Sequence, residues 1–128
     1  MSTVSTRYTN TGNAEASAAT LSAPTYAYLG PNNELFVADS GNHRVLVMPA
    51  SGTAISAATR VLGQDQFNFM SPNLVEGREF QFNLTDSNNQ THYDGGIVVD
   101  QNANPPHLYI ADTYNNRILG FRDARAVG

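Results

Sequence analysis

The chain contains the stretch Leu35-Phe-Val-Ala-Asp-Ser-Gly-Asn-His-Arg-Val-Leu-Val-Met48, which recurs as Leu108-Tyr-Ile-Ala-Asp-Thr-Tyr-Asn-Asn-Arg-Ile-Leu-Gly-Phe121. Asp39 aligns with Asp112 and Arg44 with Arg117, both 73 residues apart, so the two copies align without a gap. Self-similarity at a fixed register is typical of repeat proteins, in which one unit cannot bury its apolar face alone. The repeat therefore predicts a chain that stacks against further copies of its own unit.

Each copy of the stretch is expected to form a β-hairpin. Two β-prone runs flank a turn rich in Asp, Asn and Gly, residues that bond their own backbone or accept a positive φ. In the first copy the runs are residues 35–38 and 44–48, and in the second they are 108–111 and 117–121. Further strand candidates precede the hairpins, at 26–29 and 97–100, and follow the first one, at 59–63. Four short antiparallel strands match one blade of a β-propeller.

These runs predict an all-β chain with two propeller blades of four short antiparallel strands, forming part of a larger propeller. We expect an N-terminal strand and linker in residues 1–23, a first blade in 24–63, a long connector in 64–95 and a second blade in 96–128 that lacks its outer strand. The β-prone segment Thr3–Thr9 is a candidate for an outer strand in a neighbouring blade. The alternative is a leader without regular structure, because chain ends often lack order.

The composition argues against several classes of function. Within 128 residues there are seven Lys plus Arg, no lysine and a net charge of -4, so nucleic-acid binding and attachment to an anionic membrane are not expected. The absence of cysteine excludes disulfides, thiolate metal sites and thiol nucleophiles. Residues 1–13 are polar and carry no signal-peptide core, so we expect a soluble chain, although a parent protein with an upstream signal could be exported.

The repeated stretch resembles the NHL repeat, at residues 35–45 and again at 108–118. The resemblance implies a β-propeller, commonly of six blades. The segment 60–67 is similar to the outer strand of a bacterial subgroup with long inter-blade connectors. In that family the hairpin turns and the connector lie at one end of the blade. The implied binding face consists of His43, Tyr114, Asn116, Arg78, His92 and Tyr93.

The repeated polar residues are expected to serve the blade itself. We predict that the carboxylates of Asp39 and Asp112 accept N–H groups of the turn and pair with the arginine five residues later, Arg44 or Arg117. We interpret Asn42 and Asn115 as turn formers. The alternative for the aspartates is a metal site at the mouth of the ring. No cofactor is expected, with calcium or zinc left open.

Two further features concern the turn and the connector. His43, His92 and His107 share no metal-like spacing. His43 could line a central site if several copies surround an axis, but its counterpart in the second copy is Asn116, so we interpret it as a solvated turn histidine. The connector carries aromatic residues among polar ones, and Phe80 and Phe82 are expected to share one face of an extended segment. The connector also carries five carboxylates, which we interpret as a solvated acidic loop: Asp65, Glu76, Glu79, Asp86 and Asp94.

The favoured hypothesis for function is a non-catalytic scaffold that binds a protein or a small polar ligand on one ring face. The expected partners are further copies of the chain, with a homotrimer favoured because three pairs of blades make six, or the remaining blades of a parent propeller. The alternatives are a metal-dependent propeller hydrolase or lyase, and an RNA-binding propeller. Fold alone does not decide between these functions.

Overall fold

The structure is a computed structural model that describes residues 16–64, 66–68 and 79–128. These residues form ten strands: β1 Pro24–Leu29, β2 Glu34–Asp39, β3 Arg44–Ser51, β4 Ala54–Ile55, β5 Arg60–Leu62, β6 Asn83–Thr85, β7 Thr91–Tyr93, β8 Gly96–Asp100, β9 His107–Asp112 and β10 Arg117–Phe121. The helical elements among them are single 3-10 turns, η1 Pro31–Asn33, η2 Ser40–Asn42 and η3 Thr113–Asn115. The predicted all-β fold class is therefore confirmed. In this part of the chain no helix is long and apolar enough to cross a membrane.

The first blade is an antiparallel sheet in the order β1-β2-β3, with β5 paired to β3 as its outer strand. The four strands lie where the sequence predicts them. A short strand that the sequence analysis did not predict, β4, folds back on the end of β3 through a turn at Gly52, whose φ is +60°. The long β3 therefore carries β5 along its first half and β4 at its end.

The second blade is an antiparallel sheet in the order β10-β9-β8. Its three strands also match the predicted runs, and no fourth strand pairs with β10 among the described residues. The segment Thr3–Thr9, a candidate for an outer strand, lies outside the described residues.

The two blades have equivalent geometry at their hairpin turns. Asp39 and Asp112, the last strand residues, have φ/ψ of -86°/75° and -89°/77°. One 3-10 turn follows in each blade and ends on a residue in the left-handed region, His43 at 51°/46° and Asn116 at 53°/42°. The sequence repeat is thus also a repeat of backbone conformation.

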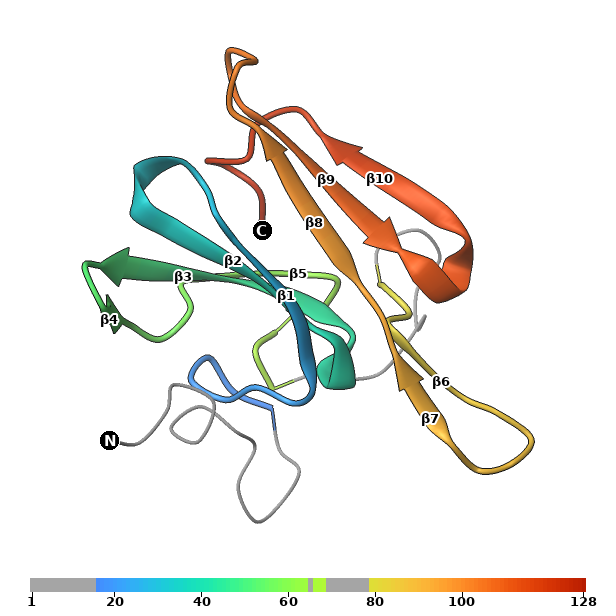
Figure 1. Ribbon diagram of the computed structural model, residues 1–128. Coiled ribbons are helices and arrows are strands. Elements are labelled where there is room, and N and C mark those ends of the chain that lie inside the picture. Colours follow the sequence, from blue (N-terminus) through green and yellow to red (C-terminus); the bar gives the residue numbers. More distant parts are fainter. Residues whose placement is uncertain (1–15, 65, 69–78) are drawn as a thin grey trace.

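The blades pack face to face, with their first strands β1 and β8 side by side (Figure 1). The hydroxyl of Thr25 donates a hydrogen bond to the carbonyl of Gly95 at 3.0 Å, and the hydroxyl of Tyr28 donates to the carbonyl of Val99 at 3.2 Å. Neighbouring first strands are the arrangement that successive blades adopt around a propeller axis.

Each blade has two faces, which we call leading and trailing. The leading face of the first blade consists of Phe36, Ala38, Val45 and Val47, and the trailing face of the second consists of Ile97, Val99, Leu108 and Ile110. Both sets are buried and form one core cluster. The trailing face of the first blade, Val37, Leu46 and Met48, is covered by a smaller cluster that includes Leu21 and Ala58.

The connector is ordered where the structure describes it. Phe80 and Phe82 are fully buried in the core between the blades. Their rings are stacked with the centroids 5.0 Å apart, which confirms that the two side chains share one face. After Phe82 the chain forms a hairpin, β6–β7, that the sequence analysis did not predict. The amide of Asp94 donates to the carbonyl of Phe82 at 2.8 Å and closes its base. The hairpin projects from both sheets (Figure 1).

The C-terminal segment returns to the first blade. The guanidinium of Arg60, on β5, donates to the carbonyls of Ala124 and Val127 at 3.3 and 2.7 Å. The amide of Ala124 donates to the carbonyl of Pro106 at 2.7 Å, and the Ala124 side chain is buried in the main core. The tail therefore bridges the outer strand of one blade and the second blade.

Candidate functional site at the hairpin turns

The repeated polar residues of the first blade form a buried network around Asp39. One carboxylate oxygen, Oδ2, accepts a hydrogen bond from Nε of Arg44 at 2.7 Å and from Nδ2 of Asn42 at 2.8 Å. The other, Oδ1, accepts from the backbone amide of Ser22 at 2.6 Å. Burial raises the pKa of Asp39 above its ordinary value, while the charge of Arg44 and these hydrogen bonds act in the opposite sense.

Arg44 connects this network to segments before and after the blade. Its Nη2 donates to the carbonyls of Ser17 and Thr20, both at 2.8 Å, and its Nη1 donates to the carbonyl of Phe67. The side chains of Arg44 and Asp39 are fully buried. A planar guanidinium with five donors suits such a site, because it can pair with a carboxylate and several carbonyls together.

The second blade repeats the network around Asp112. Oδ2 accepts from Nε of Arg117 and from Nδ2 of Asn115, both at 2.7 Å, and Oδ1 accepts from the amide of Gln81 at 2.7 Å. Nη2 of Arg117 donates to the carbonyl of Glu79 at 3.0 Å. The side chain of Arg117 stays 30% exposed, because no described residue covers it as Phe67 covers Arg44.

The two networks hold equivalent backbone segments by hydrogen bonds. The amide of Gly41 donates to the carbonyl of Ser22 at 2.7 Å, and the amide of Tyr114, at the same repeat position, donates to the carbonyl of Gln81 at 3.2 Å. Ser22 and Gln81 therefore occupy the same place, each held by an aspartate and by a turn amide. Each motif clamps the segment that enters its own blade.

This geometry agrees with the predicted contacts of the aspartates and adds one backbone donor that the sequence did not indicate. The pairing of each aspartate with an arginine is confirmed. Each carboxylate also accepts an N–H group of its own turn, from the side-chain amide of Asn42 or Asn115, but neither Asp39 nor Asp112 makes a side-chain cap bond to a backbone amide of the turn. The entering segment supplies the backbone donor because it crosses directly beside the carboxylate.

The clamped residues Ser22 and Gln81 were not identified from the sequence. They lie 17 and 31 residues before their aspartates, so the fixed repeat offset does not relate them. A weaker signal was present, because each clamped residue follows one buried apolar residue, Leu21 or Phe80. The difference in spacing comes from the β6–β7 hairpin, which is inserted between Gln81 and β8.

His43 is not a solvated turn histidine, which corrects the interpretation from the sequence. It is only 5% exposed, and its Nδ1 accepts the backbone amide of Phe82 at 3.0 Å. Burial lowers the pKa of His43 to about 4, and the charge of Asp112 opposes this shift in part. Its backbone carbonyl also accepts a hydrogen bond from the side chain of Gln64 at 3.1 Å. His43 thus joins the first blade to the connector.

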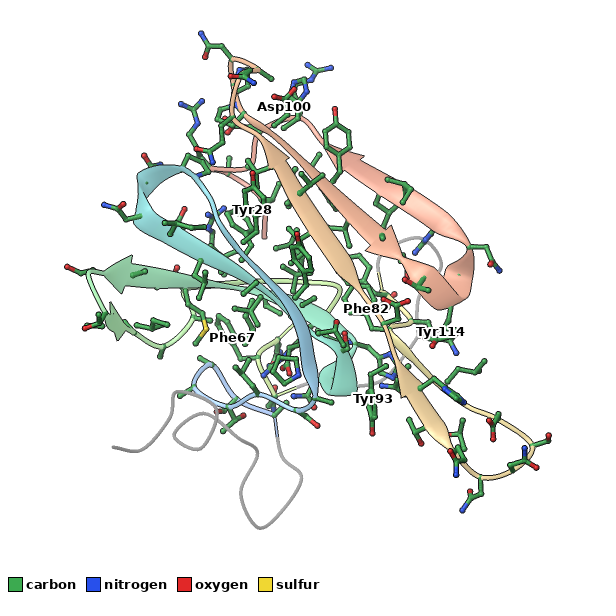
Figure 2. The ribbon with its side chains drawn as sticks, viewed as in Figure 1. Tyr28, Phe67, Phe82, Tyr93, Asp100 and Tyr114 are labelled. Atoms are coloured by element: carbon green, nitrogen blue, oxygen red, sulfur yellow. The ribbon has the colours of Figure 1, made fainter. Side chains whose placement is uncertain are left out.

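The residues of the expected binding face differ in how far they are exposed. Phe82, Tyr93 and Tyr114 lie at the same end of the molecule, so the hairpin and the second turn share that end (Figure 2). Tyr93, His92 and Asn116 are exposed, while Tyr114 is half-buried. His43 does not belong to an open surface, and Arg78 lies outside the described residues.

The connector carboxylates do not form one solvated loop. Glu79 is buried, with 4% exposure, which corrects the prediction for that residue. Asp86 pairs with Nε2 of His92 at 2.8 Å on the exposed hairpin, and this bond lowers the pKa of Asp86. Asp94 is exposed, and Asp65 and Glu76 lie outside the described residues. In residues 16–64, 66–68 and 79–128, no three His, Asp or Glu side chains are grouped to hold a metal ion.

A second candidate surface is the leading face of the second blade. Val98, Tyr109 and Ile118 are 49%, 37% and 68% exposed. Strand pairing and repeat offset make Tyr109 the counterpart of Phe36, and Ile118 the counterpart of Val45, both of which are 0% exposed in the first blade. The same positions are therefore core in one blade and open surface in the other.

The comparisons with known proteins agree with this geometry. The family model of the NHL repeat matches residues 24–48, which span β1, β2 and most of β3. No curated protein and no solved structure matches the chain significantly.

Proposed function

Because the chain carries an NHL repeat and so belongs with the NHL-repeat proteins, we propose that it is a non-catalytic propeller scaffold whose blades close into a ring with further blades. One observation carries the proposal. The leading face that the first blade buries against the second blade is open on the second blade itself.

The two outer sides of the blade pair are the open leading face of the second blade and the trailing face of the first blade, on which Leu21 and Ala58 pack. An unpaired leading face fits the trailing face of a further blade, as Phe36 and Val45 already fit Ile110 and Leu108 within the chain. Contacts of this head-to-tail type form closed rings when the rotation between units closes. Three copies with two blades each would give six blades, so we propose a homotrimer. Further blades of a longer polypeptide would use the same faces.

The proposed ring carries its binding surface at the turn end. The β6–β7 hairpin exposes Leu84 and Tyr93, each 45% accessible, and Asn116 is exposed at the neighbouring turn. Tyrosine and asparagine provide contact area together with hydrogen-bonding groups, which suits a protein or a small polar ligand. The ring would hold this surface rigidly, because the clamps at Asp39 and Asp112 fix the turns.

Native mass spectrometry and light scattering at micromolar concentration test the assembly. We expect a species of three times the 13.8 kDa chain mass. Val98→Glu, on the open leading face, should give monomers, since a carboxylate there would be buried without a partner. Leu84→Glu is the matched control on the projecting hairpin and should leave the oligomer intact. A wild-type chain that stays folded and monomeric would contradict the proposal.

Metal analysis of the purified protein tests the non-catalytic part. The scaffold requires no metal, whereas a propeller hydrolase or lyase of this type would retain calcium or zinc in a stoichiometric amount. A constant ratio of either metal to protein after dialysis would revive the catalytic alternative.

A further inference from the structure

The outer edge of β10 is open, whereas the equivalent edge of β3 is covered. On β3, Val45, Leu46 and Val47 pair with the outer strand β5. Their counterparts on β10 are Ile118, Leu119 and Gly120, and no strand pairs with them on that side among the described residues. Ile118 is also 68% exposed, whereas Val45 is fully buried.

The backbone of this edge is directed outward. The carbonyl of Val47 accepts the amide of Thr59 on the β5 side at 3.0 Å. Because alternate residues of a strand direct both backbone groups to the same side, Gly120 and Ile118 direct theirs to the open edge of the second blade. Such an edge is a template for another strand.

A cavity of about 520 Å³ lies beside this edge. Its lining includes Leu62 of β5, Phe80 of the connector, Leu119 and Phe121 of β10, and Val127 of the tail. A strand added to β10 would direct every second side chain into this cavity. The site therefore fits an extended segment with apolar or aromatic residues two or four positions apart.

We propose that this edge is covered by the segment Thr3–Thr9 of a second copy of the chain, which completes the second blade. The inference rests on the proposed ring. The segment has the required pattern, because Val4 and Tyr8 are four residues apart and would lie on one face if the segment were extended. Its spacing is similar, because β5 precedes the clamped Gln81 by 19 to 21 residues and Thr3–Thr9 precedes the clamped Ser22 by 13 to 19.

The position of Leu21 indicates that the segment comes from another copy. Leu21 and Ala18 pack on the trailing face of the first blade, next to Leu46, whereas β10 belongs to the blade on the opposite, leading side. In a head-to-tail ring this trailing face would meet the second blade of the neighbouring copy. The segment that precedes Leu21 would then reach the neighbour's β10, as β5 reaches β3 within the first blade.

Amide hydrogen exchange of the full-length oligomer tests the strand. We expect the amides of Ile118 and Gly120 to exchange at least tenfold more slowly in wild type than in Thr6→Pro, since proline cannot donate to a strand ladder. Thr11→Pro, just outside the segment, is the matched control and should keep the protection. An oligomer in which Thr6→Pro leaves both amides protected overturns the inference.

Mixing two variants tests whether the strand is exchanged between copies. Gly120→Pro removes a backbone donor from the β10 edge and leaves the segment Thr3–Thr9 unchanged. Thr6→Pro leaves the β10 edge unchanged and prevents Thr3–Thr9 from pairing as a regular strand. Isotope-labelled Thr6→Pro mixed with excess Gly120→Pro should regain protection at Ile118 and Gly120. No gain in a mixed oligomer overturns strand exchange while the ring stands, and a wild-type chain that never oligomerises overturns the ring and the exchange together.

Discussion

Nε of Arg44 lies 2.7 Å from Oδ2 of Asp39 with both side chains fully buried, while Arg117 and Asp112 keep the same distance with the arginine 30% exposed. The two pairs share the spacing of Asp, Asn and Arg and the same backbone conformation, so their difference in exposure arises from what packs over them. Removing one partner of a buried pair leaves an uncompensated charge, and the cost grows with burial.

Replacing the buried arginine should therefore cost more than replacing the exposed one. We expect Arg44→Met to lower the free energy of unfolding by about 3–5 kcal/mol, because Asp39 would be left charged and unpaired. Arg117→Met should cost less, about 1–3 kcal/mol, because Arg117 is 30% exposed and water can reach part of the site around the buried Asp112. Urea unfolding of both variants measures the difference, and equal losses would show that the cover over Arg44 is energetically unimportant.

Gly41 should be required by the close approach of the clamped segment. A Cβ at this position would lie 2.6 Å from the carbonyl oxygen of Ser22 and 2.3 Å from its hydroxyl. We expect Gly41→Ala to cost about 1–3 kcal/mol, as overpacking does in well-packed sites. Tyr114→Ala at the equivalent position is the control and should cost less, since the longer bond to Gln81 already accommodates a side chain. Thermal unfolding would compare the two, and an unchanged Gly41→Ala would refute the contact.

The free energy of unfolding should decrease as the pH is lowered from about 6.5 to 4, because of His43. The folded pKa of about 4 lies below the ordinary value of 6.5, so in this window the unfolded chain binds a proton that the folded chain excludes. The contribution is full above pH 6.5 and is lost as the pH falls to 4, by up to about 3 kcal/mol. Urea unfolding at several pH values measures the slope.

His43→Asn is the matched control for this pH dependence. The second blade places Asn116 at the same left-handed position, so asparagine fits the backbone there and does not titrate. The variant should show a flatter stability profile between pH 6.5 and 4. A profile as steep as that of wild type would assign the effect to other groups.

Phe82 should be a main determinant of how the connector holds the blades together. Its side chain is fully buried in the shared core and stacks on Phe80. We expect Phe82→Ala to lower the free energy of unfolding by about 3–5 kcal/mol. Tyr93→Ala, on the exposed hairpin, should change it by less than about 0.5 kcal/mol. Chemical unfolding of both variants checks the contrast, and similar values would place Phe82 outside the cooperative core.

Local patterns in the sequence predicted the strands and the Asp–Arg pairs. The runs around Leu35 and Leu108 have β-prone residues on both sides of a turn, and the fixed spacing of Asp39 and Arg44 brings their side chains together once the hairpin forms. These features depend on contacts between near neighbours in the chain. Local propensity is therefore sufficient to indicate them.

The partners of the clamps and the burial of His43 depend on distant contacts. The amide that His43 accepts belongs to Phe82, 39 residues later, and no local pattern marks that encounter. From the sequence alone, a histidine that follows Asn in a turn is predicted to be solvated. Its burial becomes evident only when the position of the connector is known. The β6–β7 hairpin was missed for a related reason, because its strands have three residues each and little apolar content.

The two blades have the same turn geometry and the same clamp, although an inserted hairpin precedes the second blade and, among the described residues, none precedes the first. The insertion begins after a clamped residue and ends before an inner strand, and the bond between Asp94 and Phe82 draws its two ends together. Its length and composition can therefore drift with little effect on the rest of the molecule. The position is a natural grafting point, where an engineered loop could be displayed without redesigning the blades.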